Sequence, residues 1–436
     1  GGRMYSPFPP GWPAALAVGS LLHLEWLINP LLGALNLLLA WALLVRLYDG
    51  RTARLGALLL AVSPWYLFLA MSFMAHQWTL TCALLAALGV IRARQEDGLG
   101  GALLGGLALG AVTLVRPLDG VILGVLLGLW VLGVGGRRLR LAPLIVFGIS
   151  AAAVTALNFA YNRALTGHAA TFPVMAYFDR HYAPGVNALG FGPNRGLGWR
   201  GLDPLPGHGP ADVVINTLLN LFATNVELFG WGAGSLLFAA VAVFSPRRER
   251  SDHLLLSVIL AVIAFHGLYW FSGGPDFGAR YWFLTIVPLA GLTARGLQRL
   301  EAGGATPARI PLAAVALSLV ALLTFVPWRA LDKYRDYRGM RPGIRHLATT
   351  CGFGSSLVLV QGRRFPDYAS AAAYNALPPF GDGPIYAWDR SPEERDSLHE
   401  AFPDRPIWVV AGPTVTGAGY RVVAAPTRTS NPGCTP

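Results

Sequence analysis

Apolar stretches of about 14–22 residues recur along the first three quarters of the chain and constrain its fold more than any other feature. A helix needs about 20 mainly apolar residues to cross the ~30 Å hydrocarbon core of a bilayer. Only 13% of the residues are charged, against about 25% in a typical soluble domain, so a bilayer is needed to cover this apolar surface. The sequence predicts an α-helical multi-pass membrane protein with about ten spans, near residues 31–48, 53–72, 77–93, 100–115, 118–134, 141–161, 232–245, 254–271, 280–298 and 310–328.

The short loops between these stretches are of two kinds that alternate along the chain. One kind is rich in arginine, as at 137–140 and 247–250. The other kind carries little positive charge and comprises 72–76, 115–119 and 272–279. Because arginine-rich short loops stay on the cytoplasmic side, the alternation places the long segments 163–230 and 329–436 outside the membrane.

Two further apolar segments are predicted to lie on the outer membrane surface as interfacial helices. A crossing by residues 211–230 would move the arginines of 247–250 to the outside, against the charge rule. A crossing by residues 12–29 would place His23 and Glu25 deep in hydrocarbon, which is costly. Segment 211–230 also carries a polar stripe at helical spacing, formed by Asn216, Asn220, Thr224 and Glu227.

The composition changes near residue 329, which divides the chain into a transmembrane domain, 1–328, and an outer domain, 329–436. In the second part, short β-rich runs occur at 356–361, 406–410 and 420–424, and a helix is predicted at 392–401. Ser391 followed by Glu394 has the spacing of a capping box, which would open that helix. The pattern predicts a small α/β domain of about 100 residues, a usual domain size.

Two of the three cysteines, Cys351 and Cys434, bracket this predicted outer domain. In an oxidising compartment they could pair and close the domain at both ends. Two free thiols are the equal alternative, since a sequence does not give the distance between them.

Neither nucleic acid nor a soluble cofactor is indicated. The net charge is +11, but many of the arginines punctuate apolar runs instead of gathering on one soluble face, so nucleic acid is not a predicted partner. The chain has no Walker loop, no paired-histidine zinc motif and no nucleophile elbow. No cofactor or metal site is predicted, while a divalent cation stays open. His266, alone in apolar surroundings, is expected to need only a local partner.

Polar residues gather at the predicted outer ends of the spans, where a binding site would lie at headgroup depth. Arg280 stands at the outer start of a helix, and Arg116 precedes Pro117, a natural first helical residue. Cations at these positions add to the positive end of the helix dipole and could hold a lipid phosphate. The alternative is that the arginines extend to headgroups or pair locally with Asp119 and Asp276. The predicted binding residues are His76, Arg116, Asn162, Arg280 and Tyr281.

The stretch Tyr5-Ser6-Pro7-Phe8-Pro9-Pro10-Gly11-Trp12 resembles the Pro-Pro segment in the first outer loop of GT-C glycosyltransferases. Among these enzymes, the arrangement of segments most resembles that of the dolichyl-phosphate-mannose protein mannosyltransferases and of the bacterial aminoarabinose transferase of lipid A. The turn Ala279-Arg280-Tyr281, the long outer loop and the outer C-terminal domain fit the same architecture.

This resemblance implies transfer of a sugar from a polyprenyl-phosphate donor to a lipid, glycan or protein acceptor on the outer face of a bacterial plasma (inner) membrane. Arg116 and Arg280 would then steady the departing carrier phosphate, with His76, Tyr281 and Asn162 lining the cavity. The resemblance also implies a catalytic acid in the first outer loop, which is expected upstream of Gly1. The catalytic residue is therefore unassigned within this sequence.

Three other functions compete with this interpretation. A secondary transporter would place its coupling residues near the bilayer midplane, in broken helices related by internal repeats. A polymerase or ligase of lipid-linked oligosaccharides would share the carrier chemistry. A non-catalytic membrane scaffold would not need polar groups bunched on one side. The sequence leaves the sugar, the acceptor and the oligomeric state open.

Overall fold

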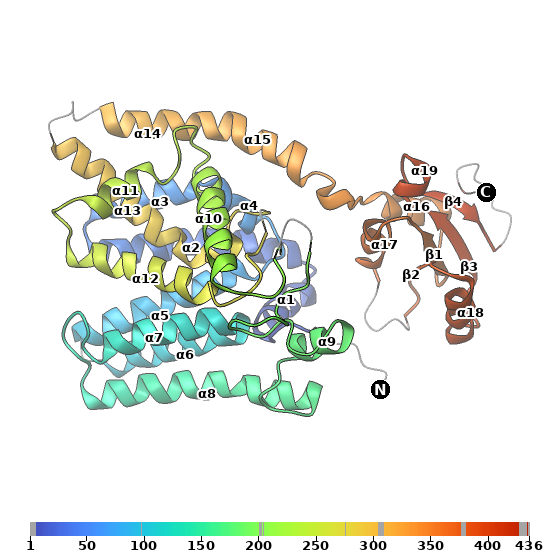
Figure 1. Ribbon diagram of the computed structural model, residues 1–436, viewed down its shortest axis with the longest axis horizontal. Helices are drawn as coiled ribbons and strands as arrows, with labels where there is room; N and C mark the ends of the chain where they lie inside the picture. The colour runs from blue at the N-terminus through green and yellow to red at the C-terminus, as the bar shows by residue number, and fades with distance from the viewer. Residues whose placement is uncertain are drawn as a thin grey trace. The chain divides into compact units, whose positions relative to one another are not determined.

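The computed structural model describes residues 6–96, 98–199, 203, 205–274, 276–303, 309–375, 381–426 and 434. These residues divide into two compact units, Ser6–Val326 and the residues from Pro327 onward. The first unit is a bundle of helices, and the second is a small sheet flanked by helices (Figure 1). The assignment of 1–328 to the membrane and of 329–436 to the outside stays a prediction.

Helices make up most of the first unit. Side-chain oxygens of Asp49 and Ser63 accept backbone N–H groups at the starts of α3 and α4, and prolines open α4, α7, α9 and α10. The helices are α1 (Gly11–Leu21), α2 (Glu25–Leu47), α3 (Gly50–Ala61), α4 (Pro64–Ala70), α5 (His76–Glu96), α6 (Leu99–Val115), α7 (Pro117–Val131), α8 (Leu141–Thr166), α9 (Pro173–His181), α10 (Pro210–Glu227), α11 (Leu237–Phe244), α12 (Arg250–His266), the 3-10 helix η1 (Arg280–Thr285), α13 (Ile286–Ala302) and α14 (Arg309–Val320).

Every predicted span overlaps a helix, but the helices differ in their ability to cross a membrane. In the described part of the chain, three are long and apolar enough to cross alone: Glu25–Leu47, Leu141–Thr166 and Arg309–Gly339. The predicted span 53–72 is a pair of helices, α3 and α4, bent by 62°. The predicted span 232–245 holds only the eight-residue α11, about 12 Å long and too short to cross. The multi-pass helical architecture is present, whereas the count of about ten spans is not confirmed.

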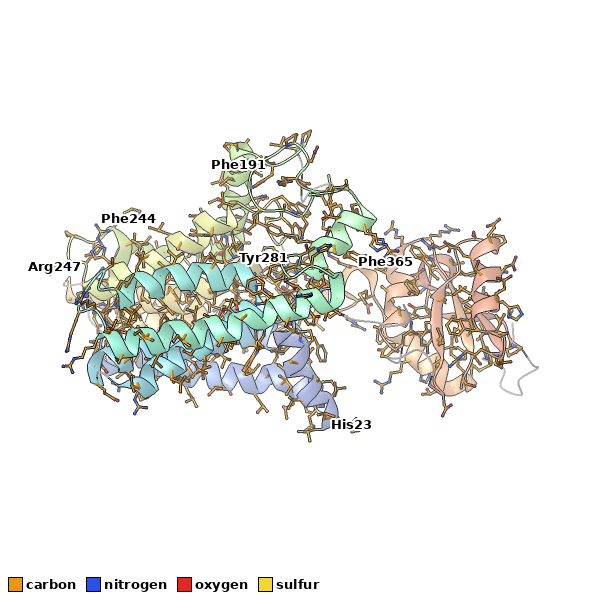
Figure 2. The ribbon with its side chains drawn as sticks, turned by 90° about the horizontal axis from the view of Figure 1, so that it is seen from below. His23, Phe191, Phe244, Arg247, Tyr281 and Phe365 are labelled. Atoms are coloured by element: carbon orange, nitrogen blue, oxygen red, sulfur yellow. A yellow bond between two sulfur atoms is a disulfide. The ribbon has the colours of Figure 1, made fainter. Side chains whose placement is uncertain are left out.

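The arginine-rich loops gather at one end of the bundle. Arg51 lies 2.7 Å from Glu301, and Arg299 donates to the carbonyl oxygen of Arg247 over 2.9 Å. Figure 2 shows Arg247 at one end of the bundle and His23 at the other. Loops that the charge alternation assigned to one side of the membrane are thus in direct contact with each other.

The loops with little positive charge gather at the opposite end. The guanidinium carbon of Arg116 lies 5.2 Å from the ring centre of Tyr281, and the charges of Arg116 and Arg280 both act on His76. The predicted surface segment 12–29 is not one helix, because α1 ends at Leu21 and α2 begins at Glu25. His23 adopts a left-handed φ of 55° in the break between them.

The polar stripe of α10 points in the direction opposite to the one expected for a solvated surface helix. Its four polar side chains are buried against the rest of the unit, while apolar side chains such as Leu218 and Phe222 are exposed. Figure 1 shows α10 running steeply across the long helices of the bundle. The predicted helix and its polar stripe are therefore present, and the stripe faces the interior of the unit while the apolar face is left for lipid.

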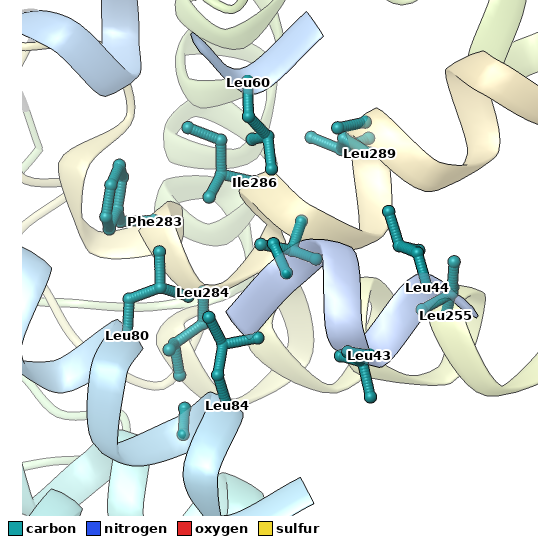
Figure 3. Close-up of a cluster of buried hydrophobic side chains, with 14 of the residues drawn as sticks. Leu43, Leu44, Leu60, Leu80, Leu84, Leu255, Phe283, Leu284, Ile286 and Leu289 are labelled. Atoms are coloured by element: carbon teal, nitrogen blue, oxygen red, sulfur yellow. The ribbon is translucent and has the colours of Figure 1, made fainter. Parts of the chain in front are cut away.

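The core of the first unit is formed by branched and aromatic side chains from helices distant in sequence (Figure 3). Leu44 from α2 and Leu60 from α3 are both fully buried, as is Ile286 at the start of α13. Gly291 lies beside the tip of Leu44, so that a Cβ there would come within 2.9 Å of it. This core fixes η1, with Phe283 and Leu284, against α5.

The second unit is a four-stranded sheet with helices around it. The strand order is β2-β1-β3-β4, with β1 parallel to both neighbours and β4 antiparallel to β3. The predicted strands and the predicted helix are confirmed, and Ser391 accepts the backbone N–H of Glu394 at the helix start. Strand β2 was not predicted. The elements, including the helical segments that lead in, are η2 (Ala321–Phe325), α15 (Val326–Trp328), η3 (Arg329–Tyr334), η4 (Tyr337–Gly339), α16 (Gly343–Cys351), β1 (Leu357–Gln361), α17 (Phe365–Ala372), β2 (Ile385–Trp388), α18 (Pro392–Ala401), β3 (Ile407–Ala411), α19 (Pro413–Thr416) and β4 (Arg421–Ala424).

Cys351 and Cys434 form a disulfide in this unit, with their Cα atoms 5.5 Å apart. Cys434 is fully buried, and Cys351 packs against the cluster around Phe353. Of the two alternatives left open by the sequence, the structure contains the paired one.

Candidate functional site

Tyr281, the second residue of η1, lies at the centre of a cluster of charged and aromatic side chains (Figure 2). The guanidinium carbon of Arg116 is 5.2 Å from the centre of its ring, and that of Arg280 is 5.7 Å away. The ring of His266 stacks on Tyr281 with 5.7 Å between centroids. Residues 116, 266 and 280–281 come from three separate segments, so the helical bundle assembles this cluster.

Arg116 belongs to a chain of paired groups that ends at His266. It is the residue before Pro117 at the start of α7, which places Asp119 in the first helical turn. The Nε atom of Arg116 lies 3.1 Å from Oδ2 of Asp119, and Nε2 of His266 lies 2.9 Å from Oδ1 of the same carboxylate. Asp119 is completely buried. The local ion pair considered from the sequence is present, and it compensates part of the charge of Arg116.

Arg280 has unmet hydrogen-bonding capacity. Its Nε atom is buried and has no hydrogen-bond partner among the described residues. The guanidinium group also lies over the ring of Phe271, with its carbon 5.9 Å from the centroid. Leaving a buried donor without a partner costs about 1–3 kcal/mol, and more for a charged group. Arg280 is therefore well suited to bind an anion.

His76, the first residue of α5, lies beside the same two arginines. The charges of Arg116 and Arg280 both act on it, and its ring packs edge-on against Phe283 with centroids 5.9 Å apart. Neither ring nitrogen has a hydrogen-bond partner within the described ranges. Four of the predicted residues, His76, Arg116, Arg280 and Tyr281, are thus brought together.

Asn162, the fifth predicted residue, makes local contacts. It lies in the last turn of α8, and its Nδ2 atom donates to the carbonyl oxygen of Ala169 over 3.0 Å. This contact stabilises the start of the loop that follows α8. A role for Asn162 in lining the cavity stays a prediction.

A small pocket lies next to Tyr281 and extends the cluster toward α10. Its walls come from α10, the end of α12 and the segment after it, and are formed by Asn216, Thr217, Asn220, Ile263, His266, Gly267, Phe271, Ser272, Tyr281 and Trp282. Asn216 and Asn220 were predicted only as part of the polar stripe of a surface helix, so the sequence interpretation missed them as pocket residues. Their helical spacing was the available signal, but spacing does not tell inside from outside.

The loop 163–210 packs onto the segment that forms this pocket. Trp199 meets the rings of Trp270 and Phe271, each with 5.6 Å between centroids. Nε2 of His208 lies 2.9 Å from the carbonyl oxygen of Gly267. Trp199 is therefore adjacent to the pocket wall. Within the described residues, no group of three or more His, Cys, Asp or Glu side chains could hold a metal ion.

Comparison with known proteins gives structural matches alone. No protein-family model and no curated protein sequence matches the chain. ArnT from Cupriavidus metallidurans in the apo state superposes with a TM-score of 0.55 at 14% identity, over 95% of this chain and 84% of that one. ArnT bound to undecaprenyl phosphate gives 0.49 at 15% identity, over 93% and 83%. The apo oligosaccharyltransferase of Archaeoglobus fulgidus gives 0.46 at 15% identity, over 79% and 50%.

The match to apo ArnT, an aminoarabinose transferase, covers most of both chains. At 14% sequence identity, this similarity is evidence for a shared fold alone. It agrees with the resemblance noted at the Pro-Pro segment and with the membrane-length helices. The predicted fold class is confirmed: this protein has the GT-C fold of membrane-embedded glycosyltransferases.

Proposed function

We propose that this protein transfers a sugar from a polyprenyl-phosphate donor to an acceptor on the outer face of a bacterial inner membrane. The observation that carries the proposal is the placement of two guanidinium groups, those of Arg116 and Arg280, around the single ring of Tyr281. The shared GT-C fold supports the same class of reaction. The sugar, the acceptor and the orientation of the protein are part of the proposal.

The chemistry explains why arginines are needed at this point. When an acceptor attacks the anomeric carbon, the bond to the carrier phosphate breaks and negative charge accumulates on the phosphate. Cations already fixed in place stabilise that charge most effectively, because they need not reorganise during the reaction. Arg280, with its unmet donor, would contact the phosphate most closely. Arg116, held by Asp119, would add a second, weaker contribution.

The acceptor hydroxyl must also lose a proton, which requires a general base. Asp119 is already bound to Arg116 and His266, so this carboxylate serves to hold these two side chains in place. The general base is therefore not assigned to any described residue.

The disulfide between Cys351 and Cys434 supports an outer location for the second unit, since disulfides persist in oxidising compartments such as the periplasm. The proposal accordingly places residues 329–436 outside the membrane. It also agrees with the gathering of the arginine-rich loops at one end of the bundle, which the charge rule assigns to the cytoplasm.

The test is transfer of labelled sugar from polyprenyl-phosphate sugars by membranes that contain the protein. A hydrogen bond to a charged group contributes about 1.5–3 kcal/mol, so Arg280→Ala should slow transfer about 10- to 100-fold. Arg116→Ala should have a smaller effect because Asp119 compensates part of its charge. Arg51→Ala, which removes an ion-paired arginine at the opposite end of the bundle, is the matched control and should leave transfer unchanged. Equal transfer by all four proteins would refute the phosphate site.

One observation favours the transporter alternative. The bend of 62° between α3 and α4 is a broken helix of the kind around which transporters build binding sites. Solute uptake into vesicles that contain the protein, without any transfer of sugar, would support transport over glycosyl transfer.

A further inference from the structure

The helix α10 presents amide side chains to the interior of the first unit. Asn216 and Asn220 are buried, whereas Leu218 and Phe222 on the same helix are 61% and 70% exposed. Burying an amide is unfavourable unless its hydrogen bonds are satisfied. The inward direction of these two side chains therefore calls for a reason inside the protein.

One half of each amide is satisfied by the backbone. Nδ2 of Asn216 donates to the carbonyl oxygen of Trp270 over 3.1 Å, and Nδ2 of Asn220 donates to that of Ser272 over 3.2 Å. A carbonyl oxygen can only accept, so the amide nitrogen must face it. The orientation of both side chains is thereby fixed from the side of segment 270–272.

The other half of each amide is unused. In the part of the chain that the structure describes, neither Oδ1 of Asn216 nor Oδ1 of Asn220 receives a hydrogen bond. Both residues line the pocket beside Tyr281. An amide oxygen is an acceptor with a partial negative charge, so it attracts hydroxyl and amino groups and repels phosphate. The pocket wall thus differs chemically from the arginine cluster next to it.

The spacing of the two oxygens fits a small polyol. The residues are four positions apart on one helix, which separates them by about 6 Å along its axis. That is comparable to the width of one sugar ring, so the two oxygens would meet different groups of one sugar. The pocket has room for about one water molecule as it stands, so the sugar enters as α10 moves away from segment 270–272. Phe271 and Trp282 provide apolar walls in the same pocket, against which the carbon face of a sugar could pack.

We infer that Asn216 and Asn220 form a sugar subsite, in which their amide oxygens accept hydrogen bonds from hydroxyl or amino groups of the donor sugar. The inference rests on the proposed function and deepens it. The carrier phosphate lies at Arg116 and Arg280, and the sugar extends from it past Tyr281 toward α10. The sugar held there must offer at least two donor groups.

The test separates recognition of the sugar from recognition of the carrier. Purified protein in lipid nanodiscs binds labelled undecaprenyl phosphate, and unlabelled undecaprenyl phosphate or its hexose and aminopentose phosphodiesters compete. The ratio of the two competitor affinities gives the sugar increment for each sugar, and the sugar with the largest increment is used further. A neutral hydrogen bond is worth about 1 kcal/mol, so Asn216→Ala and Asn220→Ala should each reduce the increment about 5-fold. Their affinity for undecaprenyl phosphate itself should stay within about twofold, which also shows that the variants are folded.

Leu218→Ala, on the exposed face of the same helix, is the matched control and should change neither quantity. Wild-type protein supplies a second measurement that does not depend on variants. Analogues of the preferred sugar that lack one hydroxyl or amino group should bind about 5-fold more weakly for at least two positions. Each of these losses should disappear in one of the two asparagine variants, as expected for a coupled pair.

An unchanged sugar increment in both Asn216→Ala and Asn220→Ala would overturn the subsite while leaving the phosphate site intact. Failure of the wild-type protein to bind undecaprenyl phosphate, or equal binding by Arg280→Ala, would instead overturn the proposed function and the subsite with it.

Discussion

Removing the disulfide between Cys351 and Cys434 should destabilise the second unit strongly. The two cysteines are 83 positions apart, so the bond closes most of this unit into one covalent loop. The chain-entropy relation gives a stabilisation of about 4.5 kcal/mol for a loop of this length, and measured losses on removing native disulfides are about 2–5 kcal/mol. A small domain has a total stability of about 5–15 kcal/mol. Cys351→Ala should therefore remove a large part of it.

Hydrogen exchange of the full-length chain in detergent is a suitable assay, because it reports on each unit separately. The amides of β1 are informative, since Val358 and Val360 are fully buried in the core of the second unit. Their protection should fall by about 2–4 kcal/mol in Cys351→Ala. Cys82→Ala is the control, as Cys82 is a buried free cysteine of the first unit. A loss below about 1 kcal/mol in β1 would refute the argument from loop closure.

The same disulfide tests the proposed orientation. In intact cells, a membrane-impermeant thiol reagent should label Cys434→Ser protein, which leaves the half-buried thiol of Cys351 free, or reduced wild-type protein, and should not label untreated wild-type protein. Labelling of the untreated protein would show free thiols and remove the support for an oxidising compartment.

Three further predictions concern packing, the buried ion pair and alkaline stability. A Cβ at Gly89 would lie 2.5 Å from the backbone nitrogen of Gly105, so Gly89→Leu should lower the unfolding temperature in detergent, at a cost of about 1–3 kcal/mol. Gly100→Leu, where no atom is within 4 Å, should not, and equal shifts would contradict the reason given. Asp119→Asn leaves a buried arginine and histidine without their anion and should cost about 3–5 kcal/mol in the same measurement; an unchanged midpoint would count against the pair. Burial raises the pKa of Tyr386 from 10.0 to about 12. The stability that neutral Tyr386 contributes is complete below the pKa of the unfolded chain and is lost as pH rises through the pKa of the folded protein. Tyr386→Phe should therefore reduce the loss of stability of the second unit on alkaline titration. Identical titrations of the two proteins would refute this.

Much of the fold could be predicted because apolar runs and capping residues act locally. The helix at 392–401 was found from Ser391 and Glu394, whose cap the structure contains. Strand β2, Ile385–Trp388, was not predicted, although β4, Arg421–Ala424, has the same length, so length alone does not decide whether a strand is recognised. The short length of α11 was also not predicted. The apolar run 232–245 includes turn residues as well as the helix, and apolar composition does not distinguish the two.

The candidate site could be predicted in part for a different reason. Charge alternation placed the loops of His76, Arg116 and Arg280 at one end of the bundle, where the structure brings them together. The link from Asp119 to His266 joins residues that are far apart in sequence, so no local pattern reveals it. The inward direction of the α10 stripe was not predicted for a related reason: periodicity shows that a helix has two faces, but the surroundings decide which face is inside.

The two ends of the bundle differ in how firmly they are held. At the arginine-rich end, Asp252 is bound by Arg299 and by the hydroxyl of Tyr48, and Arg295 contacts Glu249, so three separate segments are cross-linked. At the end with the pocket, polar groups such as those of His76 lack partners within the described part of the chain. During the proposed reaction, the helices would then move little at the arginine-rich end. Helices would spread and close at the second end, so that substrate entry need not disturb the whole bundle.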